Sequence, residues 1–278
     1  MSLGRSLTIS NSHSRRDAGD NDVVRKLAAY DGSDWAWEFL RRNEDYKADW
    51  RSSLPQHLPC ITLTDGTRLL RLPRRFPRAE KWGLSAFADP RLGAHQTPVF
   101  WHADALKRIV RLNATRPTPE SKTASLTLAD FRVDRHAVIG VDSVPLVLMK
   151  GGGIHVPIAI RGLRVLTLPF APVFELNDLA DIAAQTELLK QLKRFAEPSF
   201  QKAQRPPFAN DERLQHALIA LDESLHGKTY REIATTIFGE KKVTEDWRSH
   251  SQFLKDRTRR LVAKGTELMN GGYRDLLG

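Results

Sequence analysis

The sequence predicts an α+β protein, and three observations support this fold class. Short apolar segments separated by turn residues follow one another between residues 136 and 168, which is typical of antiparallel strands. Apolar residues recur at helical spacing on both sides of that block, most clearly near the end of the chain. With 278 residues, 41% of them hydrophobic, the chain is long enough for one large domain or two modest ones.

The N-terminal region, residues 22–112, is predicted to begin with a helix. Residues 1–21 before it are polar and are expected to form a disordered tail. Over residues 34–50, aromatic side chains recur at near-helical intervals, and either Ser33 or Asp34 can cap the helix. We interpret the aromatic stripe as part of a domain core rather than a base-stacking surface, because aromatic residues supply much of the buried area in small cores.

A hairpin and a basic segment are expected next. Residues 61–72 alternate apolar and polar side chains around Asp65-Gly66, which favours a β-hairpin with a type I′ turn. Residues 73–78 are basic and extended, and two interpretations stay open. The segment is either a soluble connector or an arm that contacts phosphates through Arg74, Arg75 and Arg78. Residues 103–112 then favour a short helix.

The middle region, residues 126–196, is predicted to be an antiparallel β-meander covered by a helix. Its expected strands are residues 136–141, 144–149, 154–160 and 163–168. A helix from about residue 177 to residue 196 has an apolar face that would cover this sheet. Linkers rich in Pro, Ser, Thr or charged residues are expected at residues 113–125 and 197–210.

The C-terminal region, residues 211–278, is predicted to hold a helix-turn-helix. Its first helix covers residues 212–225 and can be capped by Asp211. Thr229 and Glu232 then have the spacing of a capping box, in which each side chain binds a free backbone N–H group of the other residue. This spacing predicts the start of a second helix.

That second helix covers residues 230–238, and Gly239 is placed to end it. The connection that follows, residues 240–250, is longer than the tight turn of the simplest motif, which indicates a winged or extended variant. A third helix begins near residue 251, and the Gly271-Gly272 pair ends it. This third helix is unusually rich in arginine.

A polyanionic partner is favoured by the net charge of +10 and a pI near 9.9. At about 100° per residue, the basic residues of the third helix fall on both flanks of its apolar stripe, where guanidinium groups can bind phosphates or guanine edges. The residues expected to bind DNA are Arg231, Arg248, Lys255, Arg257, Thr258, Arg259, Arg260 and Lys264. The alternative is the solvated face of an ordinary amphipathic helix.

Several other functional classes find no support in the sequence. The single cysteine, Cys60, cannot form an internal disulfide, which fits a reducing cytoplasm. No apolar run is long enough to span a membrane. The nine histidines show no metal-ligand spacing, and the chain has no nucleophile elbow. We therefore expect no catalytic residue, metal or cofactor, and we do not expect an enzyme.

Two groups of residues resemble a known family. The first is Trp37-Glu-Phe-Leu-Arg-Arg-Asn43 with Tyr46 and Trp50. The second is Tyr230-Arg-Glu-Ile-Ala234 with Trp247, Arg257, Arg260-Leu261 and the closing Gly271-Gly272-Tyr273-Arg274-x-Leu276-Leu277. Together they are similar to a family of proteobacterial regulators carried on integrative and conjugative elements and related mobile DNA. The resemblance implies a transcriptional-regulator-like N-terminal region and a C-terminal helix-turn-helix, with Arg257, Arg259 and Arg260 on the DNA-facing helix.

The predicted function is sequence-specific binding of double-stranded DNA in the cytoplasm, in association with the nucleoid. The expected role is activation of excision or transfer genes on a mobile element, together with RNA polymerase. Two alternatives stay open: an antiactivator that binds a regulatory protein through the central apolar strands, and a replication initiator that binds repeated origin sites. If the protein is an oligomer, half-sites about one helical turn apart are expected.

Overall fold

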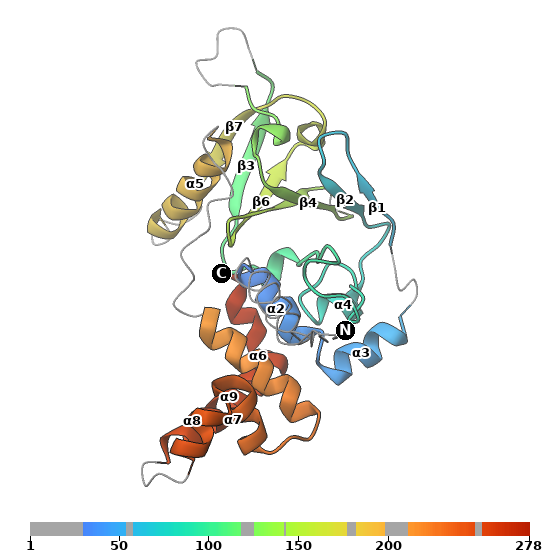
Figure 1. Cartoon of the computed structure of the whole chain (residues 1–278). Coiled ribbons are helices and arrows are strands. Elements are labelled where there is room, and N and C mark those ends of the chain that lie inside the picture. Colours follow the sequence, from blue (N-terminus) through green and yellow to red (C-terminus); the bar gives the residue numbers. More distant parts are fainter. Residues whose placement is uncertain are drawn as a thin grey trace, which may run out of the picture.

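The computed structural model describes residues 30–53, 58–117, 125–141, 143–176, 182–197, 211–247 and 252–278. The fold is α+β, as predicted. In Figure 1 the sheet lies at the top, the C-terminal helices lie at the bottom, and the N-terminal helices lie between them. None of the helices described is both long and apolar enough to cross a membrane. The predicted tail, residues 1–21, lies outside the described residues.

The sheet has seven strands in the order β1-β2-β4-β5-β6-β3-β7. Their bounds are Cys60–Thr62, Arg68–Arg71, Val110–Thr115, Asp134–Ile139, Pro145–Gly151, Ile154–Arg161 and Ala171–Glu175 for β1 to β7. Strands β4, β5 and β6 are antiparallel neighbours, which confirms the centre of the predicted meander. Strands β2 and β3, however, pair in parallel with β4 and β6. The predicted meander is therefore the middle of a larger, mixed sheet.

Two predicted elements in and beside the sheet are wrong. Residues 163–168 do not form a strand, because Gly162, at a φ of +122°, turns the chain out of β6 and a 3₁₀ helix, Leu163–Leu166, follows. Residues 103–112 do not form a helix either. They contain a 3₁₀ turn, Ala103–Ala105, and then the start of β3, where the side chains of Val110 and Leu112 are buried and that of Arg111 is exposed. This alternation is typical of a strand.

The hairpin of β1 and β2 is confirmed, but its predicted type I′ turn is wrong. The Leu63 N–H donates to the Thr67 carbonyl at 2.8 Å, and the Gly66 N–H donates to the Leu63 carbonyl at 2.9 Å. A type I′ turn needs positive φ at both central residues, whereas Gly66 has a φ of +85° and Asp65 does not have a positive φ. The Asp65 carboxylate accepts hydrogen bonds from the Thr67 N–H and hydroxyl, which stabilises the three-residue loop.

The helices of the described residues form the rest of the fold. Their bounds are Gly32–Leu40 for α2, Glu44–Arg51 for α3, Pro77–Glu80 for α4, Ile182–Ala196 for α5, Asp211–Leu225 for α6, Tyr230–Phe238 for α7, Glu240–Asp246 for α8 and Phe253–Met269 for α9, with a last 3₁₀ helix, η5, over Gly272–Leu277. The predicted helix over residues 34–50 is thus two helices. Asp31 caps the first, in place of the predicted Ser33 or Asp34, and Asn43 caps the second.

Both faces of the sheet are covered by apolar side chains. On one face, Leu192 and Phe195 of α5 pack with Val147 and Ile158, as expected for the covering helix. On the other face, the core joins the sheet to α2 and to the C-terminal helices. Its largest fully buried side chains include three aromatic residues of the predicted stripe, Trp35, Phe39 and Tyr46, and the fourth, Trp50, is only 7% exposed. The interpretation of that stripe as core is confirmed.

A cluster of buried charges fixes α2 on the sheet. Lys150 of β5 lies between two carboxylates at the start of α2, with its Nζ 2.5 Å from Asp34 Oδ1 and 3.5 Å from Asp31 Oδ2. Burial raises the pKa of Asp31, but Lys150 and His155 outweigh this effect and hold that pKa well below its ordinary value. Asp31 is therefore ionised inside the protein, and its charge is balanced by Lys150.

The C-terminal helices pack directly on α2 and on each other. At Gly32 of α2, an added Cβ would lie 2.1 Å from the carbonyl oxygen of Leu276 in η5. At Gly265 of α9, it would lie 2.5 Å from the carbonyl oxygen of Ala217 in α6. At both positions only glycine allows the backbones to approach so closely. The N-terminal and C-terminal parts of the chain therefore share one core.

We expect Gly265→Ala to destabilise the fold by about 1–3 kcal/mol, because the added methyl group would overlap the α6 backbone. In an exposed helix the same change would stabilise by about 1 kcal/mol, so the sign is diagnostic. Chemical denaturation measures the free energy of unfolding. Thr266→Ala, at the neighbouring exposed position of α9, is the control and should have little effect.

We also expect the protein to become less stable as the pH is lowered, because of His136. Burial, and then the nearby charges of Lys150 and Arg68, lower the pKa of this side chain from 6.5 to about 4. Between these two values the unfolded chain binds the proton and the folded chain does not, so this group alone destabilises the fold by about 3 kcal/mol at pH 4.

Thermal unfolding at pH 7 and at pH 4.5 tests this expectation against the variant His136→Leu. The variant should lose less stability on acidification than the wild type. Among the residues described, the buried Nδ1 of His136 has no hydrogen-bond partner, so the change should cost little at pH 7. An equal loss in both proteins would contradict the assignment.

Candidate nucleic-acid interface

Two short helices joined by one residue stand at the C-terminal end of the molecule. Helix α7 has the predicted bounds and capping box, with the Thr229 N–H donating to the Glu232 carboxylate at 2.8 Å. Gly239, at a φ of +86°, separates it from α8. The predicted long connection, residues 240–250, thus begins with a helix rather than a loop. In helix-turn-helix motifs a turn of three or four residues, often with a glycine, joins the two helices, whereas here the connection is Gly239 alone.

A small apolar core holds α7, α8 and the start of α9 together. Ala234, Val243 and Leu254, one from each helix, are buried against one another, and Phe238 and Trp247 close the cluster from its sides. Val243 is the only buried residue of α8. The other residues of α8 are exposed, so this helix presents nearly its whole outer surface to a partner.

The first basic flank of α9 faces α6. The guanidinium of Arg257 lies over the ring of Phe238, 4.7 Å from its centroid, and this contact holds the side chain in place. Arg257 and Arg260 line a pocket of about 450 Å³ together with Arg213 and His216 of α6. Burial, and to a lesser degree the charge of Arg257, lower the pKa of His216, so His216 adds no positive charge at neutral pH.

The second basic flank of α9 continues the surface of α8. The ammonium group of Lys255 lies 5.8 Å from the ring centroid of Trp247, the residue that ends α8. Arg259 is exposed and pairs with Asp256 at 3.4 Å. The sequence predicted this division of the basic residues between two flanks. What it did not predict is that one flank adjoins α6 and the other adjoins α8.

The remaining predicted DNA-binding residues differ in their location and exposure. Thr258 is fully buried, and its hydroxyl donates to the Leu254 carbonyl at 2.8 Å, so its assignment as a DNA contact is wrong. Lys264 is on the α6 flank and pairs with Glu267 at 3.0 Å. Arg231 is exposed on α7. Arg248 lies outside the described residues.

The predicted basic arm is not extended along its whole length, because its last residues belong to α4. Its side chains are exposed but form local contacts: Arg74 lies over the Phe76 ring, Arg75 pairs with Glu80, and Arg78 reaches Asp49 of α3 at 3.6 Å. Figure 1 shows α4 in the N-terminal part of the molecule, apart from α7 and α8. The structure therefore does not bring the arm together with the predicted DNA-binding helix.

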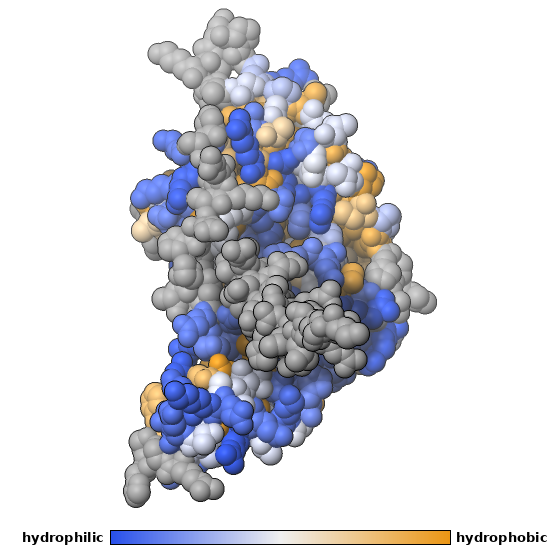
Figure 2. Space-filling model, in the orientation of Figure 1, coloured by the Kyte–Doolittle hydropathy of each residue, from blue (hydrophilic) through white to orange (hydrophobic). Residues whose placement is uncertain are grey.

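The sequence interpretation missed Lys241 and Lys242, which are both exposed on α8. The signal was present, because Val243 and Trp247 are spaced by four residues and no Gly or Pro interrupts the segment between them. Basic and acidic residues nearly balance over residues 211–278. Figure 2 shows a mostly hydrophilic surface at the C-terminal end of the molecule. DNA binding here would thus depend on a few exposed basic side chains in defined positions rather than on a uniformly basic face.

Two known protein families match different parts of the chain. Residues 167–278, a segment that contains α6 to α9, match the family model described as "T6SS, Transcription factor, DNA binding domain". The chain carries a DNA-binding domain. Residues 17–85 match a "Proteobacterial transcriptional regulator-like domain", so the protein is a transcriptional regulator whose partner is DNA. No curated protein matches the chain.

We expect the double change Lys241→Ala and Lys242→Ala to weaken DNA binding about tenfold or more, because each lysine is placed to bind a phosphate or a base edge. Each lost phosphate contact should also lower the slope of log affinity against log salt by about one. Fluorescence anisotropy at several salt concentrations measures both quantities. Lys190→Ala, an exposed lysine on α5, is the control and should change neither.

Proposed function

We propose that the protein binds promoter DNA sequence-specifically through a helix-turn-helix made of α7 and α8. The observation that carries this proposal is the one-residue connection at Gly239 within a segment that matches a DNA-binding domain. Helix α7 is the supporting helix, and α8, with exposed Lys241 and Lys242 in its first turn, enters the major groove. In helix-turn-helix proteins the start of the second helix reads base edges.

Helix α9 has a different part in this arrangement. Its flank next to α8, with Lys255 and Arg259, is placed to bind the phosphates that border the groove. Its other flank, with Arg257 and Arg260, adjoins α6 and would bind a more distant phosphate of the same duplex. The start of α7 contributes less, because the Glu232 carboxylate already accepts from the N–H of its capping residue and would repel a phosphate.

Two classes of target gene are supported by different observations. The resemblance to regulators of mobile elements favours excision or transfer genes. The description of the matched DNA-binding domain names a transcription factor of T6SS, which favours genes of a secretion system. In either case we propose an activator that acts with RNA polymerase at the nucleoid, in the cytoplasm. The central strands would then serve the fold rather than capture a regulatory protein, and no enzymatic activity or cofactor is required.

Genome-wide DNA capture tests the proposal. We expect enrichment of one motif upstream of one of these gene classes in wild type. Changing Arg257, Arg259 and Arg260 to Ala should abolish enrichment, since three phosphate contacts are lost and binding to every sequence weakens alike. Changing Lys241 and Lys242 to Ala should instead relax the motif if α8 reads the bases.

The control is Arg161→Ala with Lys190→Ala, which also removes two positive charges but on the sheet side of the molecule. It should leave the motif and its occupancy unchanged. Enrichment at directly repeated origin sites would favour a replication initiator. No enrichment in wild type, together with capture of a regulator in the absence of DNA, would favour the antiactivator.

A further inference from the structure

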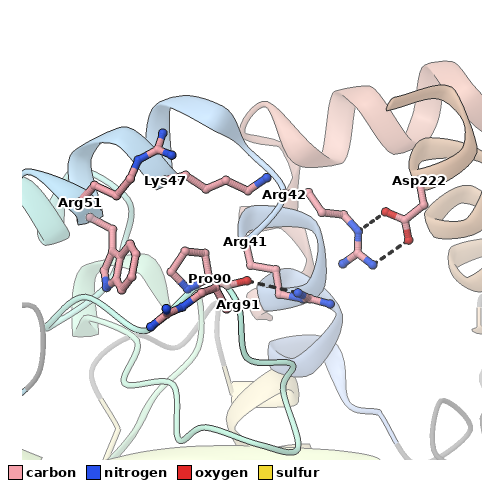
Figure 3. A pocket seen from close by; sticks show the side chains of 8 residues that line it. Arg41, Arg42, Lys47, Arg51, Pro90, Arg91 and Asp222 are labelled. Carbon is pink, nitrogen blue, oxygen red and sulfur yellow. Dashed lines mark hydrogen bonds and ion pairs between the residues drawn. The ribbon is translucent and has the colours of Figure 1, made fainter. Parts of the chain in front are cut away.

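A basic pocket lies at the junction of the N-terminal helices with α6, away from α7 and α8. Its volume is about 530 Å³, within the range of small-molecule sites. Figure 3 shows its walls: side chains of α2 and α3, the loop that holds Pro90 and Arg91, and Asp222 of α6. The lining residues are Arg41, Arg42, Lys47, Trp50, Arg51, Pro90, Arg91 and Asp222. One acidic side chain thus faces five basic ones.

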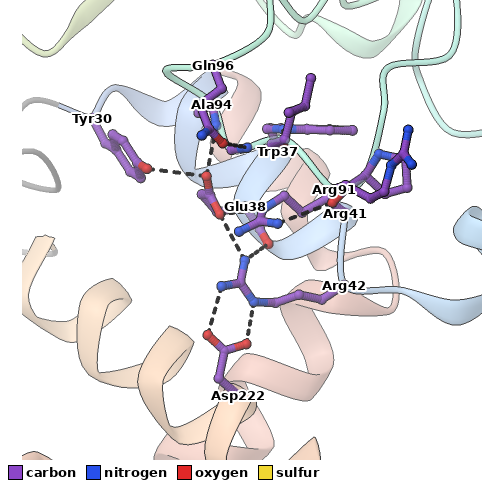
Figure 4. Close-up of polar contacts among 12 residues, drawn as sticks. Tyr30, Trp37, Glu38, Arg41, Arg42, Arg91, Ala94, Gln96 and Asp222 are labelled. Carbon is purple, nitrogen blue, oxygen red and sulfur yellow. Dashed lines mark hydrogen bonds and ion pairs between the residues drawn. The ribbon is translucent and has the colours of Figure 1, made fainter. Parts of the chain in front are cut away.

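The arginines of this pocket are held in place from behind. Glu38, which is almost fully buried, accepts hydrogen bonds from Arg41 at 2.6 Å and from Arg42 at 2.9 Å (Figure 4). Arg41 also donates to the Pro90 carbonyl at 3.2 Å. The network continues from Glu38 to the hydroxyl of Tyr30 and the N–H of Ala94. These contacts fix the guanidinium groups without using all of their N–H donors.

The other basic side chains complete the pocket from two sides. Lys47 and Arg51 lie one helical turn apart on α3, and Figure 3 shows them on the side opposite Arg41 and Arg91. Arg91 pairs with Asp89 at 2.6 Å and stacks over Trp50, 5.3 Å from the ring centroid. Its guanidinium is thus fixed in orientation as well. Cationic groups from three separate segments converge on one space.

We propose that this pocket binds a small phosphorylated anion and that its occupancy regulates DNA binding. Fixed guanidinium groups match the geometry of phosphate oxygens, which they can bind bidentately. Convergence from several directions favours a compact ligand with two or more negative charges over a single carboxylate.

The regulatory part rests on the proposed function and on the ion pair between Arg42 and Asp222. Arg42 donates two hydrogen bonds to this carboxylate, at 2.5 and 2.7 Å, and so joins α2 to α6. A bound phosphate would place negative charge beside Asp222 and compete for Arg42. Helix α6 in turn holds α9 through the close contact at Gly265. Ligand and DNA affinities are therefore coupled, and the coupling is reciprocal.

Isothermal titration of the full chain with inorganic pyrophosphate, in the absence of DNA, tests the site itself. The double variant Lys47→Ala, Arg51→Ala should bind at least about tenfold more weakly, because two charge-assisted contacts are lost. Asp222→Asn should bind several-fold more tightly, since the opposing charge is removed. The matched control Arg161→Ala, Lys190→Ala should bind as wild type does. Circular dichroism verifies that each variant is folded.

Each result of the pyrophosphate titration either supports or overturns the proposed anion site. An equal loss in the pocket variant and the control would mean non-specific attraction and would overturn it. Absence of binding at millimolar pyrophosphate would also overturn it. If pyrophosphate does not bind while the pocket variant still loses affinity for duplex DNA, the phosphate source is the DNA backbone and not a free ligand.

DNA binding measured with and without pyrophosphate tests the regulatory part. A change of several-fold in DNA affinity, absent in the pocket variant, supports the coupling, and no change refutes it. If the protein binds pyrophosphate but no DNA sequence at all, the proposed function fails and the anion site stands. The two failures are therefore distinguishable.

Discussion

The buried ammonium group of Lys150 is the constraint on which the arrangement of the other elements depends. It lies between two carboxylates at the start of α2, in the interior between this helix and the sheet, and balances the charge of Asp31. Charges in such a place are costly, and the loss of one partner typically destabilises a protein by about 3–5 kcal/mol because the other charge is then unbalanced. The cluster therefore favours the position of α2 on the sheet in which these groups are in contact.

Helix α2 transmits that position to the C-terminal part of the chain. Its first turn contacts the backbone of η5 at Gly32, and its end is joined to α6 through Arg42 and Asp222. The segments that match two separate family models thus meet along one helix. Neither part is therefore a freely moving module. Anion binding at the N-terminal pocket and DNA binding by the C-terminal helices would both act on the same packed unit.

Local signals in the sequence predicted local structure well. They failed where the structure depends on contacts between segments that are far apart in the sequence. The capping box of Thr229 and Glu232 determined the start of α7, and turn residues between apolar runs determined β4 to β6. The parallel pairing of β2 and β3 depends on partners far along the chain, which no local pattern contains. Helix α8 was missed because it buries one side chain only. Thr258 was misassigned although it lies one helical turn after the apolar Leu254, a spacing that places both side chains on the same face of α9.

The contact between Gly32 and η5 also has a consequence for synthesis on the ribosome. Helix α2 emerges early, whereas Leu276, against which it packs, emerges some 240 residues later, as their positions in the sequence require. Domains that fold as units during translation begin with their N-terminal residues. Here that order cannot be followed, because the aromatic side chains of α2 and the ring of Tyr273 are buried in one core. Helix α2 therefore remains incompletely packed until the C-terminal residues of the protein have been synthesised.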